Sequence, residues 1–260
     1  LLVGSIVSST DAAAVFAMLT IAQLFALPRR EGDPAETTSS VVQDWRTVLG
    51  NRSFLLFALA MIGSYVLSFQ VYLALPLHAA DIAPQHESAL TAAVFVVSGV
   101  VAVTAQLRLT RWFSNRWGSD RSLVVGMVVL ALSFVPLILL PDNRFGATAA
   151  VCALLVSTAA LAIGSAAVFP FEMDTVVSLS GGRLVGTHYG FYSTVVGTGI
   201  LAGNVATGAL FQAAKERGLG VLVWAALAGI GLCSAAALRA LIRTGHLRHG
   251  ADREEVVAAP

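Results

Sequence analysis

Long apolar runs alternate with short polar linkers along almost the whole chain. A membrane-spanning helix needs roughly 20 consecutive apolar residues. Six such runs lie near Ser53–Ala80, Ala89–Leu109, Ser122–Leu140, Ala147–Phe171, Val185–Ala213 and Leu219–Ile242. A further run, Leu1–Leu27, is apolar enough to span but is interrupted by polar residues at 8–11. This pattern predicts an all-α membrane protein with about seven transmembrane helices.

The polar linker before the six runs, residues 29–52, contains a shorter helical pattern. Within Ser39–Leu49 the apolar positions recur at helical spacing, at Val41, Val42, Trp45, Val48 and Leu49. Such spacing gives a helix one apolar stripe. We therefore expect an amphipathic helix along the membrane surface, with Trp45 at the depth of the lipid headgroups.

An arginine-rich stretch between the second and third of the six runs orients the chain. Residues 104–126 contain four arginines and two tryptophans. Because arginine is costly at the centre of a bilayer, the stretch predicts a short loop at the membrane surface, and such basic loops stay on the cytoplasmic side. Of the 16 Lys and Arg residues, only Arg144, Lys215 and Arg217 then fall in outer linkers. The C-terminal tail, residues 244–260, is expected in the cytoplasm and disordered.

Composition agrees with a membrane protein. The chain is 57% hydrophobic and 12% charged, whereas about a quarter of the residues in a soluble domain are charged. The net charge of +1 and the absence of a basic block give no indication of a nucleic-acid partner. Cys152 and Cys233 lie far apart within apolar runs and are interpreted as packing residues.

The motifs of several enzyme classes are missing. The sequence contains no nucleotide-binding loop that would indicate the use of ATP. An intramembrane serine protease would need Gly-x-Ser-x-Gly and a deep histidine, and neither Ser165 nor His188 has that setting. No histidine has metal-ligand spacing with a cysteine. We expect no enzyme activity, no metal and no cofactor.

Two prolines at similar depths indicate a possible internal repeat. Pro76 lies between two leucines and is followed by Asp81, while Pro170 lies between two phenylalanines and is followed by Glu172 and Asp174. Two triplets of helices that start from opposite sides of the membrane would be inverted repeats, as in secondary transporters. Chance is the alternative, because proline is common in membrane helices.

Three stretches resemble the major facilitator superfamily. Arg111–Arg121 resembles the loop after the eighth helix of these transporters, although the leading glycine and the acidic position of its signature are not clearly preserved. Residues 69–77 resemble the seventh helix of proton-coupled drug exporters in this superfamily, and residues 186–208 resemble the eleventh. The resemblance implies the C-terminal half of a twelve-helix transporter. In that half, residues 53–243 form a six-helix half-bundle with a 3+3 inverted repeat.

Residues 1–28 are expected to form a single membrane helix of uncertain origin. Residues 4–16 resemble the ion-binding helix of cation/proton antiporters, in which a Thr-Asp pair like Thr10 and Asp11 lies in a broken helix. Asp11 is the only carboxylate well inside a predicted span, which makes it the candidate proton or ion carrier. With no initiating methionine, the chain is expected to be truncated, fused or misassembled. A polar helix start near the outer surface is the alternative.

The first of the six helices carries a candidate substrate surface. Tyr65, Phe69, Tyr72 and Pro76 recur at helical spacing and so share one face. An aromatic face with Gln70 at its margin suits a bulky, amphipathic or cationic substrate. A packing seam or interfacial anchoring is the alternative.

Tyr192 and Asn204, on the glycine-rich fifth run, complete the candidate cavity, although Asn204 could instead bond a neighbouring helix. The glycines of this run are expected to allow close helix packing; they are Gly190, Gly197, Gly199, Gly203 and Gly208.

A cytoplasmic gate is the second candidate site. Glu172 and Asp174 are expected at the inner end of their helix, close to the arginine stretch. In the outward-facing state they would pair with Arg111, Arg116, Arg121 or Arg183, and such state-specific pairs bias a two-state equilibrium. The alternative is that both acids are solvated at the headgroup boundary.

These patterns favour a secondary transporter, or part of one, in the plasma membrane. It would export drug-like or small organic solutes by proton exchange, with the lipid bilayer, a small-molecule substrate and protons as its partners. A cation/proton antiporter fusion or fragment is one alternative. A non-transporting fragment or a receptor-like protein of seven helices is the other.

Overall fold

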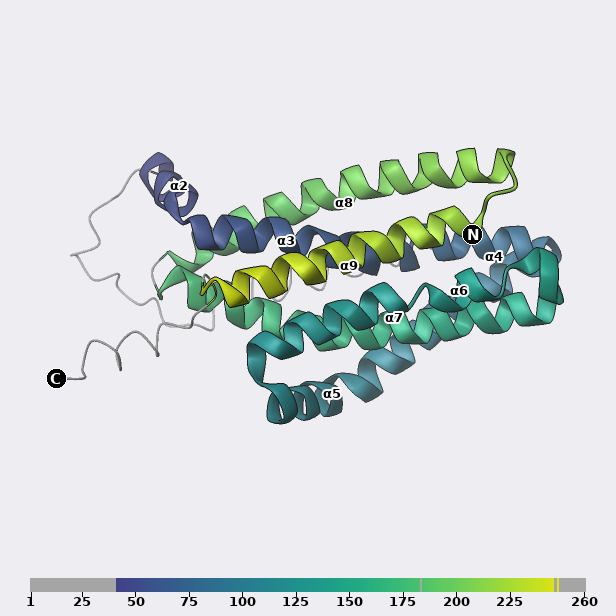
Figure 1. Cartoon of the computed structure of the whole chain (residues 1–260), viewed down its shortest axis with the longest axis horizontal. Helices are drawn as coiled ribbons and strands as arrows, with labels where there is room; N and C mark the ends of the chain where they lie inside the picture. The colour runs from purple at the N-terminus through teal and green to yellow at the C-terminus, as the bar shows by residue number, and fades with distance from the viewer. Residues whose placement is uncertain (1–40, 183, 246, 248–260) are drawn as a thin grey trace, which may run out of the picture. The chain divides into compact units, whose positions relative to one another are not determined.

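Helices make up nearly all of the chain that the structure describes. The computed structural model describes residues 41–182, 184–245 and 247, so Leu1–Leu27 lies outside the described residues. In chain order (Figure 1) the elements are α2 (Val41–Gly50), α3 (Arg52–Ser68), the short 3-10 helix η1 (Phe69–Val71), α4 (Ala74–Ile82), the 3-10 helix η2 (Pro84–His86), α5 (Glu87–Leu132), α6 (Val135–Leu139), α7 (Asp142–Ser180), α8 (Val185–Glu216) and α9 (Val221–Arg243). The all-α expectation is confirmed for these residues.

Six spans within the described residues are long and apolar enough to cross a membrane. They are Arg52–Ile82, Pro84–Gln106, Arg108–Leu139, Gly146–Ser180, Val185–Glu216 and Val221–Arg243. Each contains most of one predicted run. The predicted end of the fourth run at Phe171 was wrong, because α7 continues to Ser180 and places Glu172 inside the helix. A carboxyl group can continue a span where it faces the bundle interior and finds a partner there.

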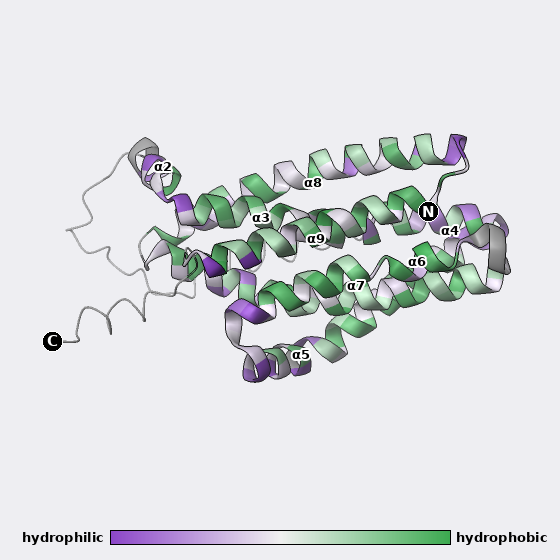
Figure 2. Cartoon of the chain, viewed as in Figure 1, coloured by the Kyte–Doolittle hydropathy of each residue, from purple (hydrophilic) through white to green (hydrophobic). Residues whose placement is uncertain are grey.

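The bundle formed by the described helices has two ends, at which the helices begin or finish. α3 begins, and α7 and α9 finish, at one end (Figure 1), which we call the arginine end because Arg52 opens α3 and Arg243 closes α9. Asn51 joins two of these helices: its side chain accepts a hydrogen bond from the Phe54 amide (3.1 Å), capping α3, and donates one to the Leu179 carbonyl (2.8 Å) near the end of α7. Hydrophobic residues predominate along the helices, and hydrophilic residues gather toward their ends (Figure 2).

The arginine-rich stretch is helical, so the predicted short loop was wrong. α5 runs through it as far as Gly118, where φ 72° and ψ 175° break the helix. That backbone conformation is available almost only to glycine. Arginine is excluded from the hydrocarbon but is a good helix former, so a helix that turns at the surface satisfies both preferences. Trp112, Phe113 and Trp117 pack against one another there, with ring centroids 5.0 to 5.3 Å apart.

α2 covers the stretch that was predicted to form an amphipathic helix, while its place along the membrane surface stays a prediction. Val48 of its apolar stripe is fully buried. Trp45 is 38% exposed and its ring lies 5.6 Å from that of Phe191 on α8. The tryptophan therefore packs against the helical bundle as well as facing outward.

Two glycines bring α8 close to α3. A Cβ atom added at Gly199 would lie 2.5 Å from Ile62 Cγ2, and one added at Gly203 would lie 2.6 Å from Val66 Cγ2. The packing role is confirmed for these two. The other three predicted packing glycines, Gly190, Gly197 and Gly208, have nothing within 4 Å of an added Cβ.

The spans differ in how much of their apolar surface is covered. In Arg52–Ile82, 61% of the most apolar window is buried, against 11% in Pro84–Gln106 and 17% in Val185–Glu216. These last two spans therefore leave most of their apolar surface uncovered by the described residues.

Candidate transport site

The helix that carries the predicted aromatic face is broken near its middle. Pro76 has no N–H, and its ring clashes with the carbonyl four residues earlier, that of Tyr72. Accordingly, α3 ends at Ser68, η1 follows, Leu73 has φ −124° and ψ −76°, and α4 begins at Ala74. The break rotates the later side chains relative to the earlier ones. The single predicted face was therefore wrong, because Phe69 and Tyr72 line one cavity while Tyr65 lies at a different cluster.

Phe69 and Tyr72 line a cavity of about 300 Å³ at the level of the break. Its lining includes Ser68, Phe69 and Tyr72 from the broken segment, Ser98 and Gln106 from α5, and Leu161 and Ser165 from α7. The hydroxyl oxygens of Ser68 and Ser165 are 2.8 Å apart and share a hydrogen bond.

Two of the residues that line this cavity, Phe69 and Tyr72, are aromatic. The rings of Phe69 and Tyr72 lie 5.6 Å apart, and Tyr72 lies 5.8 Å from Phe95 of α5. Tyr72 is 65% exposed. The cavity is thus mainly apolar, with a few hydroxyl and amide groups, which is the usual character of small-molecule sites.

Tyr65 belongs to a cluster around a buried carboxyl group. Glu172 of α7 is 2% exposed and Tyr192 of α8 is 1% exposed. The Tyr192 hydroxyl donates a short hydrogen bond to Glu172 Oε1. The phenol of Tyr65, from α3, lies close to both groups, and its ring centroid is 6.2 Å from that of Tyr192. The ring of Phe57 stacks with that of Tyr192, with centroids also 6.2 Å apart.

This buried cluster lies well inside the bundle. Glu172 precedes the end of α7 at Ser180 by two turns of helix, which places it about 12 Å from that end. The partner in the hydrogen bond is a neutral phenol, which satisfies an oxygen of the carboxyl group but brings no positive charge.

Gln70 and Asn204 form a separate contact between the broken helix and α8. Gln70 is completely buried and is not among the residues that line the cavity. Its side-chain nitrogen donates to the Val66 carbonyl (2.7 Å) and lies 3.5 Å from Asn204 Oδ1. In the described part of the chain, Gln70 Oε1 has no hydrogen-bond partner.

The residues of the predicted gate are only partly brought together. Arg111, Arg116 and Arg121 are all exposed at the arginine end. Asp174 Oδ2 accepts a hydrogen bond from Ser119 Oγ (3.3 Å), which links α7 to the arginine-rich stretch. Glu172 faces Tyr192 instead. Arg183 and Asp11 lie outside the described residues, and the gate stays a prediction.

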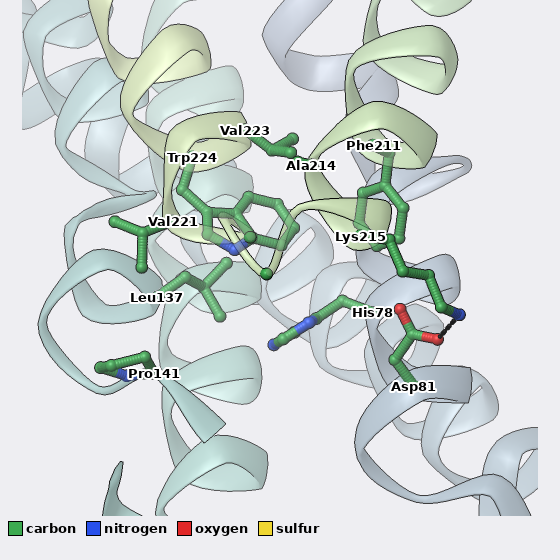
Figure 3. A pocket seen from close by; sticks show the side chains of 12 residues that line it. His78, Asp81, Leu137, Pro141, Phe211, Ala214, Lys215, Val221, Val223 and Trp224 are labelled. Atoms are coloured by element: carbon green, nitrogen blue, oxygen red, sulfur yellow. Dashed lines mark hydrogen bonds and ion pairs between the residues drawn. The ribbon is translucent and has the colours of Figure 1, made fainter. Parts of the chain in front are cut away.

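A second cavity, of about 260 Å³, lies at the opposite end of the bundle (Figure 3). Lys215 of α8 and Asp81 of α4 form an ion pair beside it. The imidazole of His78 lies 5.2 Å from the indole of Trp224 between ring centroids. The sequence placed Asp81 and Lys215 in linkers on the same side of the membrane, but it did not pair them.

Sequence reasoning missed the burial of Glu172. A signal was present, because Thr175, Val176, Val177 and Leu179 continue the apolar helical pattern beyond it. The predicted span nevertheless ended at Phe171, because the acids Glu172 and Asp174 follow it. The shared hydrogen bond of Ser68 and Ser165 had no comparable signal.

The chain is similar to one family of known proteins. The sequence profile of the Major Facilitator Superfamily matches residues 10–204. An uncharacterised MFS-type transporter of Mycobacterium tuberculosis is 54% identical over 231 residues, which cover 88% of this chain and 55% of that protein. Multidrug resistance protein MdtH of Cronobacter sakazakii is 30% identical over 185 residues, covering 71% of this chain and 44% of MdtH. MdtH of Klebsiella pneumoniae is 28% identical, covering 74% and 45%.

The matches cover only part of each relative. The chain spans about half the length of the curated relatives it matches. The family match begins at residue 10 and therefore includes Thr10 and Asp11, on which the antiporter alternative rested. No solved structure was found that matches the chain.

Proposed function

The chain belongs to the major facilitator superfamily, and we propose that it works in a secondary transporter that exports drug-like organic solutes in exchange for protons. The six described spans form one half of the transport unit. Two observations support this arrangement. The aligned part of this chain covers only 55% and 44% of two matched relatives, and Pro84–Gln106 and Val185–Glu216 leave apolar surface for another bundle to cover.

The cavity at the broken helix is the part of the substrate site that this half contributes. A cavity of about 300 Å³ is at the small end of ligand sites and can enlarge when a second bundle closes over it. Phe69 and Tyr72 supply aromatic faces, which attract both apolar rings and cations. Discontinuous helices near the middle of the membrane are where secondary transporters bind their substrates. Amphipathic aromatic cations therefore fit this site.

The observation that carries proton coupling is the burial of Glu172. Ionisable groups inside a membrane bundle are expensive and mark ion pathways or proton relays. Tyr192 and Tyr65 hold the carboxyl group in place without neutralising it. Taking up a proton removes one negative charge from the bundle interior, and releasing the proton restores it. A transporter whose two conformations expose Glu172 to opposite sides would couple that exchange to export.

The gate is proposed to lie closer to the membrane surface. Asp174 already contacts Ser119 in the turn that joins Arg116 to Arg121. In a conformation closed at the arginine end, this carboxylate would pair with one of the two arginines, and the pair would part when that end opens. Such a difference in contacts between the two states is what biases their equilibrium.

A coupling assay tests the proposal. The complete protein that carries these residues is reconstituted into liposomes, and accumulation of ethidium is measured with and without an imposed proton gradient. We expect Glu172→Gln to abolish gradient-driven accumulation while ethidium exchange at equal concentrations continues, because the amide cannot carry a proton. Tyr192→Phe should retain part of the coupled transport, since the carboxyl group remains but loses its hydrogen bond.

The matched control is Asp174→Asn, two residues away on the same helix and exposed. It should retain gradient-driven accumulation at a changed rate. Gradient-driven accumulation by Glu172→Gln at the wild-type level would refute the proton-carrying role. Failure of the unmodified protein to transport any amphipathic cation would refute the proposed substrate class.

A further inference from the structure

A long apolar groove runs along the outside of the bundle between α3 and α9. It encloses about 610 Å³. Its α3 side consists of Leu56, Leu59 and Ala60, and the two leucines are 43% and 59% exposed. These positions and Arg52 recur at i, i+4, i+7 and i+8, so Arg52 lies at the head of the same stripe of α3.

Apart from Leu241, the α9 side of the groove consists of small residues. Cys233, Ala237, Ala240 and Thr244 lie on it at helical spacing. Because these side chains are small, the groove is deep along α9, and Thr244 lies at the end of the groove nearest the arginine end of the bundle. Arg243 lies beside Thr244 in the last turn, and the whole of α9 contains no acidic residue.

The groove closes at a defined depth. A Cβ atom added at Gly63 of α3 would collide with Ser234 Oγ of α9, so the two helices touch there. From Thr244 to Cys233 the groove follows α9 for three turns, which is about 16 Å. The hydrocarbon core of a bilayer is about 30 Å thick, so one leaflet is about 15 Å. The groove is therefore as long as one leaflet is deep.

Charge complements this shape at the mouth. Arg52 begins α3 and Arg243 ends α9, both are exposed, and the two helices reach the same end of the bundle (Figure 1). Guanidinium groups bind phosphate through paired hydrogen bonds. The sequence predicts that this end faces the cytoplasm, where anionic lipids give the leaflet a negative surface potential.

We propose that the α3/α9 groove binds one anionic phospholipid of the leaflet at the arginine end. An acyl chain lies in the groove as far as the contact of Gly63 with Ser234. The phosphate is bound by Arg52 and Arg243. Lipid bound in this way bridges the first and last spans of the bundle.

Native mass spectrometry tests the proposal on the complete protein that carries these residues. The protein is purified in a mild detergent and incubated with equal amounts of phosphatidylglycerol and phosphatidylcholine that have the same acyl chains. We expect one phosphatidylglycerol to be retained in preference to phosphatidylcholine. In Arg52→Gln/Arg243→Gln its affinity should fall about 30-fold, because each arginine near the surface contributes about 1 kcal/mol to binding of anionic lipid.

Blocking the groove gives an independent readout. Ala237 is exposed, so Ala237→Trp fills the groove without disturbing the core, and we expect it to lose the retained lipid. Leu232→Trp is the matched control, because Leu232 is on the same helix, is 48% exposed and lies outside the groove. Arg217→Gln is the control for charge, since Arg217 lies at the opposite end.

Three outcomes would overturn the proposal. Equal retention of the two lipids would mean that the groove does not recognise an anionic headgroup. Equal lipid retention in Ala237→Trp and Leu232→Trp would place the lipid elsewhere. Absence of any retained phospholipid in the unmodified protein would mean that the groove is filled by another part of the protein.

Discussion

The contact of Gly203 with Val66 leads to a quantitative prediction for the packing of α8 against α3. A Cβ atom added at Gly203 would lie 2.6 Å from Val66 Cγ2 and 2.8 Å from Val66 Cγ1. Val66 is only 4% exposed, and a valine in a helix is largely confined to one rotamer. It cannot rotate away from a new methyl group. We therefore expect Gly203→Ala to destabilise the protein.

Two opposing effects set the magnitude. Alanine is favoured over glycine inside a helix by about 1 kcal/mol. Forcing an extra methyl group into a packed contact costs about 1 to 3 kcal/mol. Gly208→Ala, on the same helix, has only the first effect because nothing lies within 4 Å of its added Cβ. The difference in unfolding free energy between the two variants therefore isolates the clash, about 1 to 3 kcal/mol.

The measurement is thermal unfolding of the two variants of the complete protein in the same detergent. Each kcal/mol should separate their Tm values by about 2 to 4 °C, with Gly203→Ala the lower. Adding Val66→Ala to Gly203→Ala removes the colliding methyl groups, so the double variant should recover much of the loss attributed to the clash. Equal Tm values for Gly203→Ala and Gly208→Ala would refute the helix contact.

Three further predictions concern stability. Gly164→Ala should cost more than Gly203→Ala, at least about 3 kcal/mol, because its Cβ would lie 2.9 Å from the backbone nitrogen of Leu130, which cannot move aside; a Tm above that of Gly203→Ala would contradict this. Gly118→Ala should lower the unfolding free energy by about 1 to 3 kcal/mol, because φ is 72° there, and an unchanged Tm would place the turn elsewhere. Asp81→Asn should cost less than about 1 kcal/mol, because the side chain of Lys215 is 66% exposed; a larger loss, or one that persists in high salt, would show a tighter pair.

The positions of the six described spans could be read from the sequence because the relevant forces act residue by residue. Every backbone group inside hydrocarbon must be bonded within its own helix, so an apolar run of sufficient length becomes a helix whatever its neighbours are. The amphipathic stripe of Val41–Leu49 predicted α2 for the same local reason. The ends were less certain, because a polar residue such as Glu172 is expensive only if it finds no partner.

The candidate site could be read only in part. The helical spacing of Tyr65, Phe69 and Tyr72 predicted that they share one face of one helix. It did not reveal that the helix breaks among them, which sends Tyr65 toward Glu172 and the other two toward α5. In the sequence, Pro76 indicated only a possible repeat. Its physical effect is to clash with the carbonyl of the preceding turn, which breaks the helix.

The pattern of residues alone indicates which segments are long and apolar enough to cross a membrane, which of them carry charge at their ends and which family they resemble. These properties depend on composition and spacing within single helices, where burial in lipid is the dominant force. The packing of the helices brings Glu172 to Tyr192, Ser68 to Ser165 and Asp81 to Lys215, and no local pattern indicates these contacts. Each of these pairs joins two helices. Lipid favours every apolar helix surface about equally, so the choice of neighbours depends on close packing and hydrogen bonds between helices.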